Sequence, residues 1–145
     1  MLSEVIHLVL SLLVGLVIGQ ISGDFFRSIT FALISGFFLD LDHLVDYIII
    51  KRGKSFSFKE FSSGRYFKLV GKIRLFAHGY EYIVLFLLLA LLFPANSVVF
   101  YALAASLFFH LAFDIIHNKC KFSAYSLFYR LVNHFDIRVF GCKHN

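Results

Sequence analysis

Four long apolar segments constrain this chain more than any other feature of its sequence. They lie at residues 2–21, 25–50, 75–93 and 97–118. As helices, all four are long enough to cross the hydrocarbon layer of a bilayer, which is roughly 30 Å thick. Hydrophobic residues make up 59% of the chain and its mean hydropathy is +0.80, both outside the usual range of soluble domains. We therefore expect an all-α, polytopic membrane protein, with about four transmembrane helices bundled into one domain over residues 1–145.

Charge predicts the orientation of this bundle. The loop at residues 51–74 carries eight Lys and Arg against one acid, Glu60, and the tail at residues 119–145 is also basic. Basic segments tend to stay on the cytoplasmic side. We expect both termini and the loop in the cytoplasm, the protein in the cell (inner) membrane, and membrane lipid as its partner. The net charge of +5 then reflects topology, so no nucleic acid is expected as a partner.

The two ends of the chain also carry predictions. The first segment contains Glu4 and has no Lys or Arg before its apolar run, which favours a retained span over a signal peptide. Apolar residues between 122 and 140 recur at helical spacing, which predicts a C-terminal amphipathic helix on the membrane surface or packed against the bundle. Cys120 and Cys142 flank the basic tail, and no disulfide is expected in the reducing cytoplasm.

The ionisable residues near the cytoplasmic ends of the predicted spans are all acids or histidines. Apart from Glu4 at the very start of the first span, they are His7 in the first span, Asp40, Asp42, His43 and Asp46 in the second, His78 and Glu81 in the third, and His110, Asp114 and His117 in the fourth. A carboxylate in hydrocarbon is costly unless it is paired, so a group of them without Lys or Arg requires protons, water or a bound cation. At about 1.5 Å per helical residue, all four groups fall in one layer on the cytoplasmic side.

Helical spacing predicts that these side chains face one pocket. In the last three spans, an acid and a histidine lie three or four residues apart and so share a helix face. Helix bundles build metal sites in this way, and mixed imidazole and carboxylate ligands predict zinc, with manganese or iron as alternatives, in a site of one to three ions. The expected ligands are His7, Asp40, Asp42, His43, His78, Glu81, His110 and Asp114.

Two acids of the second span fit this pattern less simply. Asp42 is two residues from Asp40 and faces away from it unless the helix is distorted there. We expect Asp42 either to bind a second ion or to orient His43. Asp46 lies one turn further on, and an ordinary solvated acid is its favoured interpretation.

The order and spacing of these motifs resemble the membrane-bound metal-dependent hydrolase family, which is distantly similar to zinc-dependent phospholipase C. The resemblance covers roughly residues 1–118. It depends on His7, Asp40-Leu41-Asp42-His43, His78-Gly79-Tyr80-Glu81 and His110-Leu111-Ala112-Phe113-Asp114. The third element departs from the family, which often has His-Arg-Gly followed by Thr-His-Ser. We expect Glu81 to replace the second histidine there.

The resemblance implies a hydrolase in which metal-activated water attacks a phosphoester, or a related bond, of a lipid or lipid-linked substrate. Asp42 and Glu81 are the candidate catalytic carboxylates that would accept the proton. A weaker hypothesis assigns an anionic headgroup to basic residues that border the predicted pocket, although topology and acidic lipids explain them equally well. These residues are Lys51, Arg52, Lys72 and Arg74.

Two other functions stay open at the level of sequence. A proton or metal-ion transporter would use the same buried acids and histidines, but it would need polar residues that continue into the outer half of the membrane. Ser11, Gln20, Ser35 and Ser106 make only a sparse path there. A non-catalytic membrane scaffold protein would carry the polar layer incidentally.

Overall fold

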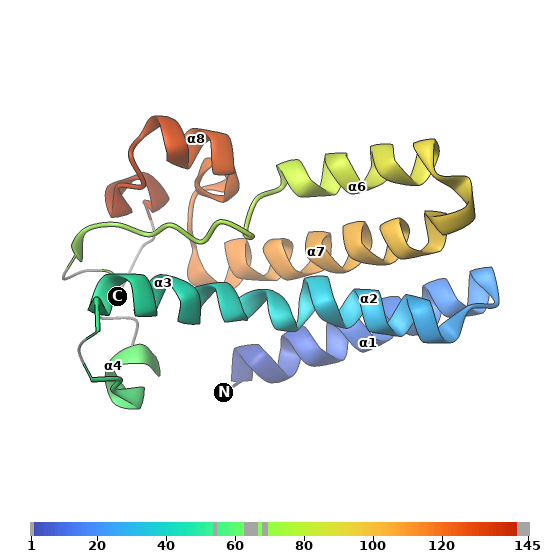
Figure 1. Cartoon of the computed structure of the whole chain (residues 1–145), viewed down its shortest axis with the longest axis horizontal. Helices are drawn as coiled ribbons and strands as arrows, with labels where there is room; N and C mark the ends of the chain where they lie inside the picture. The colour runs from blue at the N-terminus through green and yellow to red at the C-terminus, as the bar shows by residue number, and fades with distance from the viewer. Residues whose placement is uncertain (1, 54, 63–66, 68–69, 142–145) are drawn as a thin grey trace.

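The computed structural model describes residues 2–53, 55–62, 67 and 70–141 and has an all-α fold (Figure 1). The longer helices are α1 (Leu2–Ser22), α2 (Phe25–Gly36), α6 (Glu81–Leu92) and α7 (Ser97–Asn118). The shorter helices are α3 (Leu41–Lys51), α4 (Phe58–Ser62) and α8 (Leu127–Val132). The 3₁₀ turns are η1 (Phe38–Asp40), η2 (Pro94–Asn96), η3 (Phe122–Tyr125) and η4 (Ile137–Phe140). The predicted all-α class is confirmed for these residues.

Two helical hairpins form the bundle. Between α1 and α2, Gly23 adopts a positive φ of 77°, and Asp24 caps α2 by accepting a 3.0 Å hydrogen bond from the Arg27 amide. η2 joins α6 to α7, and Pro94 is its first residue. α1, α2 and α7 pack against one another, whereas α6 packs against α7. Figure 1 shows α3 continuing roughly along the line of α2.

Two helical stretches are long and apolar enough to cross a membrane, by length and composition alone: Ser3–Ser22 and Pro94–Asn118. α6 is apolar but shorter. The second predicted span, residues 25–50, is interrupted between α2 and α3, and the third, residues 75–93, becomes helical only at Glu81. The structure thus departs from four continuous helices at two places, and both carry predicted site residues.

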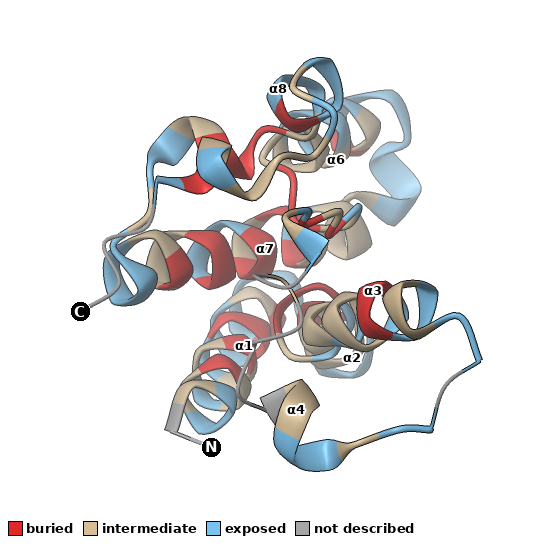
Figure 2. Ribbon diagram, turned by 90° about the vertical axis from the view of Figure 1, so that its left-hand side faces the viewer, coloured by how far each residue is buried: buried red, intermediate tan, exposed pale blue. Residues whose placement is uncertain are grey.

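The described part of the chain exposes apolar side chains and buries polar ones. Ile21 is 81% exposed, Phe26 82% and Leu91 70%. Soluble monomers rarely expose large apolar area on this scale. The buried set, by contrast, contains serine, histidine, aspartate and arginine side chains, and Figure 2 shows buried positions along α1 and α7.

The helices approach most closely at Gly36, the last residue of α2. A Cβ atom at this position would lie 2.1 Å from the Oγ atoms of both Ser11 in α1 and Ser106 in α7. Ser11 Oγ donates to His7 O and Ser106 Oγ donates to Ala32 O, so neither hydroxyl can move away without losing a hydrogen bond. Glycine therefore lets three helices meet beside the predicted metal ligands.

The C-terminal region packs against the bundle. Tyr125 and Phe140 are buried in one apolar cluster with Leu75, Leu107 and Leu111. α8 has only six residues, and η3, η4 and a turn at residues 133–135 make up most of the rest of the stretch predicted as one amphipathic helix. Packing against the bundle is therefore the alternative that the structure supports.

The cysteines differ from the prediction of reduced thiols. Cys120 is disulfide-bonded, so no free thiol occurs in the described part of the chain. Cys142 lies outside the described residues.

Candidate metal centre

The interruption between α2 and α3 brings two acids to one site. α2 ends at Gly36, η1 covers Phe38–Asp40, and α3 begins at Leu41. A 3₁₀ turn has three residues per turn where an α-helix has about 3.6, so it changes the direction of the side chains that follow. Asp40 and Asp42 consequently both contact His78, which a regular helix would prevent.

Two histidines have their Nδ1 atoms held by oxygen acceptors. His110 Nδ1 lies 2.6 Å from the carbonyl oxygen of Gly36, which can only accept, so this nitrogen carries the proton. His78 Nδ1 lies 3.3 Å from Asp42 Oδ2, which also accepts the Ala77 amide at 2.7 Å. In the neutral rings, both Nε2 atoms therefore present lone pairs. Asp42 has an orienting role, but toward His78 and not toward His43.

The Nε2 atoms of these two histidines face each other. They lie 3.3 Å apart, and Asp40 Oδ1 lies 3.5 Å from His78 Nε2 and 3.6 Å from His110 Nε2. Both histidines are only 1% exposed, so bulk water does not screen their Nε2 atoms from each other. Three acceptor atoms this close repel one another unless a proton or a cation lies among them.

A second group of donors shares His110. His7 Nε2 lies 3.3 Å from Asp114 Oδ1, and His110 Nε2 lies 3.5 Å from Asp114 Oδ2. The rings of His7 and His110 stack with their centroids 3.9 Å apart. His7 Nδ1 is buried and has no hydrogen-bond partner among the described residues. A buried polar atom without a partner is unusual in a folded protein.

Asp40 links the two groups, because its Oδ2 lies 4.0 Å from His7 Nε2 while its Oδ1 faces the other two histidines. In each group, the ligand atoms lie within 4.8 Å of one another. We name the five residues the His–Asp cluster: His7, Asp40, His78, His110 and Asp114. Its nitrogen and oxygen donors are close enough together that they could hold a metal ion.

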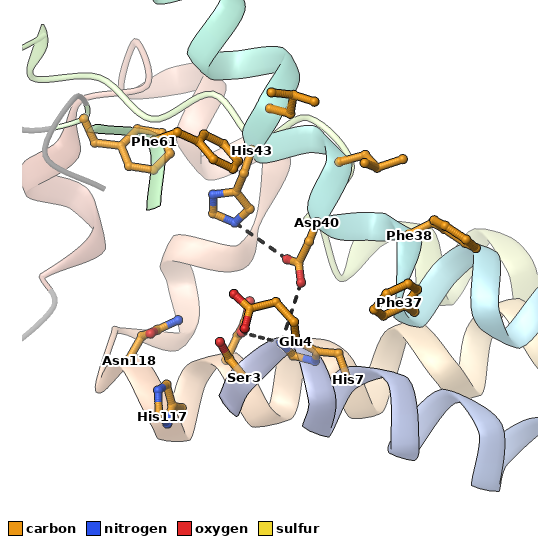
Figure 3. Close-up of a pocket in the computed structure, with 14 residues that line it drawn as sticks. Ser3, Glu4, His7, Phe37, Phe38, Asp40, His43, Phe61, His117 and Asn118 are labelled. Atoms are coloured by element: carbon orange, nitrogen blue, oxygen red, sulfur yellow. Dashed lines mark ion pairs between the residues drawn. The ribbon is translucent and has the colours of Figure 1, made fainter. Parts of the chain in front are cut away.

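A cavity of about 580 Å³ lies beside the His–Asp cluster and is lined in part by it (Figure 3). His43 lines this cavity, with its Nε2 3.8 Å from Asp40 Oδ1, but it belongs to neither group of ligand atoms. Polar side chains such as Glu4 and His117 line the cavity together with apolar ones such as Phe37. The wall of the cavity is therefore polar on one part and apolar on another.

Glu81, a predicted ligand and catalytic carboxylate, lies outside the His–Asp cluster. Its Oε2 accepts the Leu127 amide at 3.0 Å, its Oε1 accepts the Phe128 amide at 3.1 Å, and the Ser126 hydroxyl also donates to it. The helical spacing that paired Glu81 with His78 does not apply, because α6 begins only at Glu81. Glu81 instead binds the N-terminus of α8, where anionic side chains are stabilising.

The basic residues considered for a headgroup also lie away from the cavity. Lys51 is paired with Glu60, and Arg74 is paired with Asp46. Arg52 and Lys72 are exposed. Among the described residues that line the cavity there is no Lys or Arg.

Sequence reasoning missed one set of residues beside the cluster. Asp46, expected to be solvated, is 1% exposed and accepts hydrogen bonds from the amide and the guanidinium of Arg74, at 2.9 and 3.0 Å. Arg130 is fully buried and donates to backbone carbonyls next to His78. The spacing of Asp46 from Asp42, four residues along one helix, was the only available signal, and nothing in the sequence singled out Arg130.

No protein-family model, curated protein or solved structure matches this chain.

Proposed function

We propose that this protein is a membrane-embedded, metal-dependent hydrolase that acts on a phosphoester of a lipid or lipid-linked substrate. One observation carries the proposal: the Nε2 atoms of His78 and His110 face each other at 3.3 Å, with Asp40 Oδ1 beside both. Their Nδ1 atoms are hydrogen-bonded to Asp42 and Gly36, so neither ring can turn its lone pair away without losing a bond. A cation bound among these three atoms would remove the repulsion between them.

The ligands of that cation would come from the His–Asp cluster. Asp40, His78 and His110 form one set, and His7 and Asp114 complete a second set with His110. Imidazole mixed with carboxylate favours zinc over magnesium or calcium. A bound cation of this kind lowers the pKa of water and stabilises negative charge on a phosphoryl oxygen. The protein's own contribution is to fix the ligands: Asp42 orients His78, and the end of α2 orients His110.

The shape of the cavity supports an amphiphilic substrate. Phe38 and Leu41 line it and are also 49% and 56% exposed, so its apolar wall continues onto the outer surface of the bundle. Glu4 and His117 form a polar wall. Acyl chains would lie against the apolar wall while the headgroup reaches the His–Asp cluster. The phosphoester itself is supported by the resemblance to membrane-bound metal-dependent hydrolases.

A membrane location is supported by the exposed apolar helices. We propose four crossings, made by α1, by α2 with α3, by α6 with the residues before it, and by α7. The basic segments favour a cytoplasmic site, whereas a disulfide at Cys120 is typical of oxidising compartments. Reporter fusions at the C-terminus decide between the two sides. A cytoplasmic signal supports the orientation proposed here, and an external signal overturns it.

Transport is the less favoured alternative, because the buried serines do not form an open polar path. Ser11 Oγ donates to His7 O at 2.6 Å, and Ser106 Oγ donates to Ala32 O at 2.7 Å. Ser35 Oγ donates to Leu103 O at 2.9 Å. These hydroxyls tie the helices together and offer no chain of exchangeable partners along the bundle.

Hydrolysis can be tested with purified protein in detergent and phospholipids or lipid phosphates as substrates. We expect release of a water-soluble product that stops on chelation and returns when zinc, manganese or iron(II) is added. His110→Ala should abolish it, because both ligand groups use His110. Activity that survives chelation would contradict the proposal. Uptake of protons or metal ions into liposomes, without hydrolysis, would favour a transporter instead.

A further inference from the structure

His78 does not sit on a helix but on an irregular stretch at residues 72–80, which we name the His78 strap. Helix α6 starts only after it, and Leu75 within it adopts a positive φ of 38°. An irregular backbone lacks the hydrogen bonds that a helix supplies, so its amide and carbonyl groups need other partners. The position of His78 therefore depends on whatever holds the strap.

On one side, α3 holds the strap by two carboxylates. Asp42 Oδ2 accepts the Ala77 amide at 2.7 Å, and Asp46 Oδ2 accepts the Arg74 amide at 2.9 Å. The two acids are four residues apart and project from the same face of α3. They thus anchor the strap at both sides of Leu75.

On the other side, Arg130 of α8 holds the strap by its carbonyl groups. Its Nη1 donates to Arg74 O at 2.8 Å and Leu75 O at 2.6 Å, and its Nη2 donates to His78 O at 2.7 Å. Its Nε lies 3.3 Å from Ser126 O, which links the same guanidinium to its own helix. Arg130 is 0% exposed, so these bonds are not weakened by competing water.

Arg130 is itself held in place by the N-terminus of α8. Glu81 accepts the first amides of α8 and the Ser126 hydroxyl, and it follows the strap directly in sequence. The C-terminal segment and the strap are thus tied together by Arg130, by Glu81 and by two backbone hydrogen bonds, from Ile73 N to Phe135 O at 2.9 Å and from Tyr80 N to Tyr125 O at 3.0 Å. Lysine could not replace this arginine, because an ammonium group lacks the planar fork that reaches several carbonyls at once.

We propose that Arg130 is a positioning residue for His78, and that metal binding at the His–Asp cluster depends on the C-terminal segment through it. This inference rests on the proposed metal site. Arg130 touches neither the cluster's ligand atoms nor the cavity; it acts by fixing the carbonyl of His78 while Asp42 fixes the ring. Partners that orient metal ligands typically change metal affinity by about 10- to 100-fold when they are altered.

The test is a double-mutant cycle in the full-length protein, with Co²⁺ binding followed by its visible absorption in detergent. Arg130→Lys should weaken binding about tenfold or more in the wild-type background. In a His78→Ala background it should weaken binding less than about twofold, because the ligand that Arg130 positions is already gone. Arg138→Lys is the matched control: Arg138 is exposed and pairs only with Asp136 in the described chain, so Co²⁺ affinity should not change.

Two other outcomes of the double-mutant cycle would contradict the positioning role or the metal site. Equal losses in both backgrounds mean that Arg130 acts through overall stability, which overturns the positioning role and leaves the metal site intact. A wild type that binds no Co²⁺ stoichiometrically overturns the metal site and this inference with it. If Arg130→Lys does not fold, Glu81→Gln replaces it in the cycle, because it loosens the anchor of α8 and should show the same dependence on His78.

Discussion

Asp46→Ala is predicted to destabilise the protein strongly, although Asp46 touches none of the proposed ligand atoms. The substitution leaves the Arg74 amide without its acceptor, which costs about 1–3 kcal/mol for a buried group. It also removes the charge-assisted bond from the Arg74 guanidinium, whose side chain is 25% exposed and can partly rehydrate, at about 1 kcal/mol. The expected total is about 2–4 kcal/mol, a large part of the stability of a typical domain.

Thermal unfolding in detergent, with chelator present, measures this loss without any contribution from metal. Asp46→Asn should lie between wild type and Asp46→Ala, because the amide oxygen can still accept from the Arg74 backbone. Asp136→Ala is the control. Its carboxylate is also paired with an arginine, Arg138, whose hydrogen bonds lower the pKa of Asp136 to about 2. Arg138 is exposed and Asp136 only half-buried, so the loss of this pair should be small.

Equal unfolding temperatures for Asp46→Ala and Asp136→Ala would contradict this prediction. That result would mean that Asp46 is solvated, as its sequence position suggested, and that the strap is held by other contacts. Destabilisation by Asp46→Ala without any recovery in Asp46→Asn would contradict the role assigned to the Arg74 amide.

The remaining predictions concern the cluster and the helix contact beside it. Gly36→Ala should cost about 1–3 kcal/mol in thermal unfolding, since the new Cβ would lie 2.1 Å from two hydroxyl oxygens; an unchanged melting temperature would show that α2 can shift freely. Chelation should lower the melting temperature of wild type. The free energy of unfolding should fall by about 2.7 kcal/mol if the metal was present at 100 times its Kd. It should leave that of His110→Ala unchanged, and an equal shift in both would point to metal bound elsewhere. His117→Ala should keep the metal content of wild type, because this exposed side chain lines the cavity without joining either ligand group. Loss of metal in His117→Ala would place the metal site nearer the surface.

Helical spacing predicted the site residues correctly only where the helix that carries them is regular. His110 and Asp114 lie on the continuous helix α7, so their four-residue spacing correctly placed both on one face. Asp42 was ambiguous because the sequence showed no break in the second apolar segment. The 3₁₀ turn follows Gly36, where α2 lies against Ser11 and Ser106 of two other helices, and no local pattern in the sequence encodes these tertiary contacts.

In the third apolar segment, the sequence predicted a helix where the structure has an irregular backbone. Helical spacing paired His78 with Glu81, but the chain before Glu81 is irregular, so the two side chains diverge: one enters the His–Asp cluster and the other binds α8. Two of the residues that hold this stretch, Asp46 and Arg130, are distant in sequence from each other. Their hydrogen bonds to its backbone leave no periodic signature in the sequence.

Metal analysis of the purified protein tests the central claim most directly. Wild type, isolated without chelator, should contain at least one zinc, manganese or iron ion per chain after extensive dialysis. His110→Ala should contain much less, and His117→Ala should match wild type. A wild type without stoichiometric metal, or a His110→Ala protein that retains it, would contradict the account.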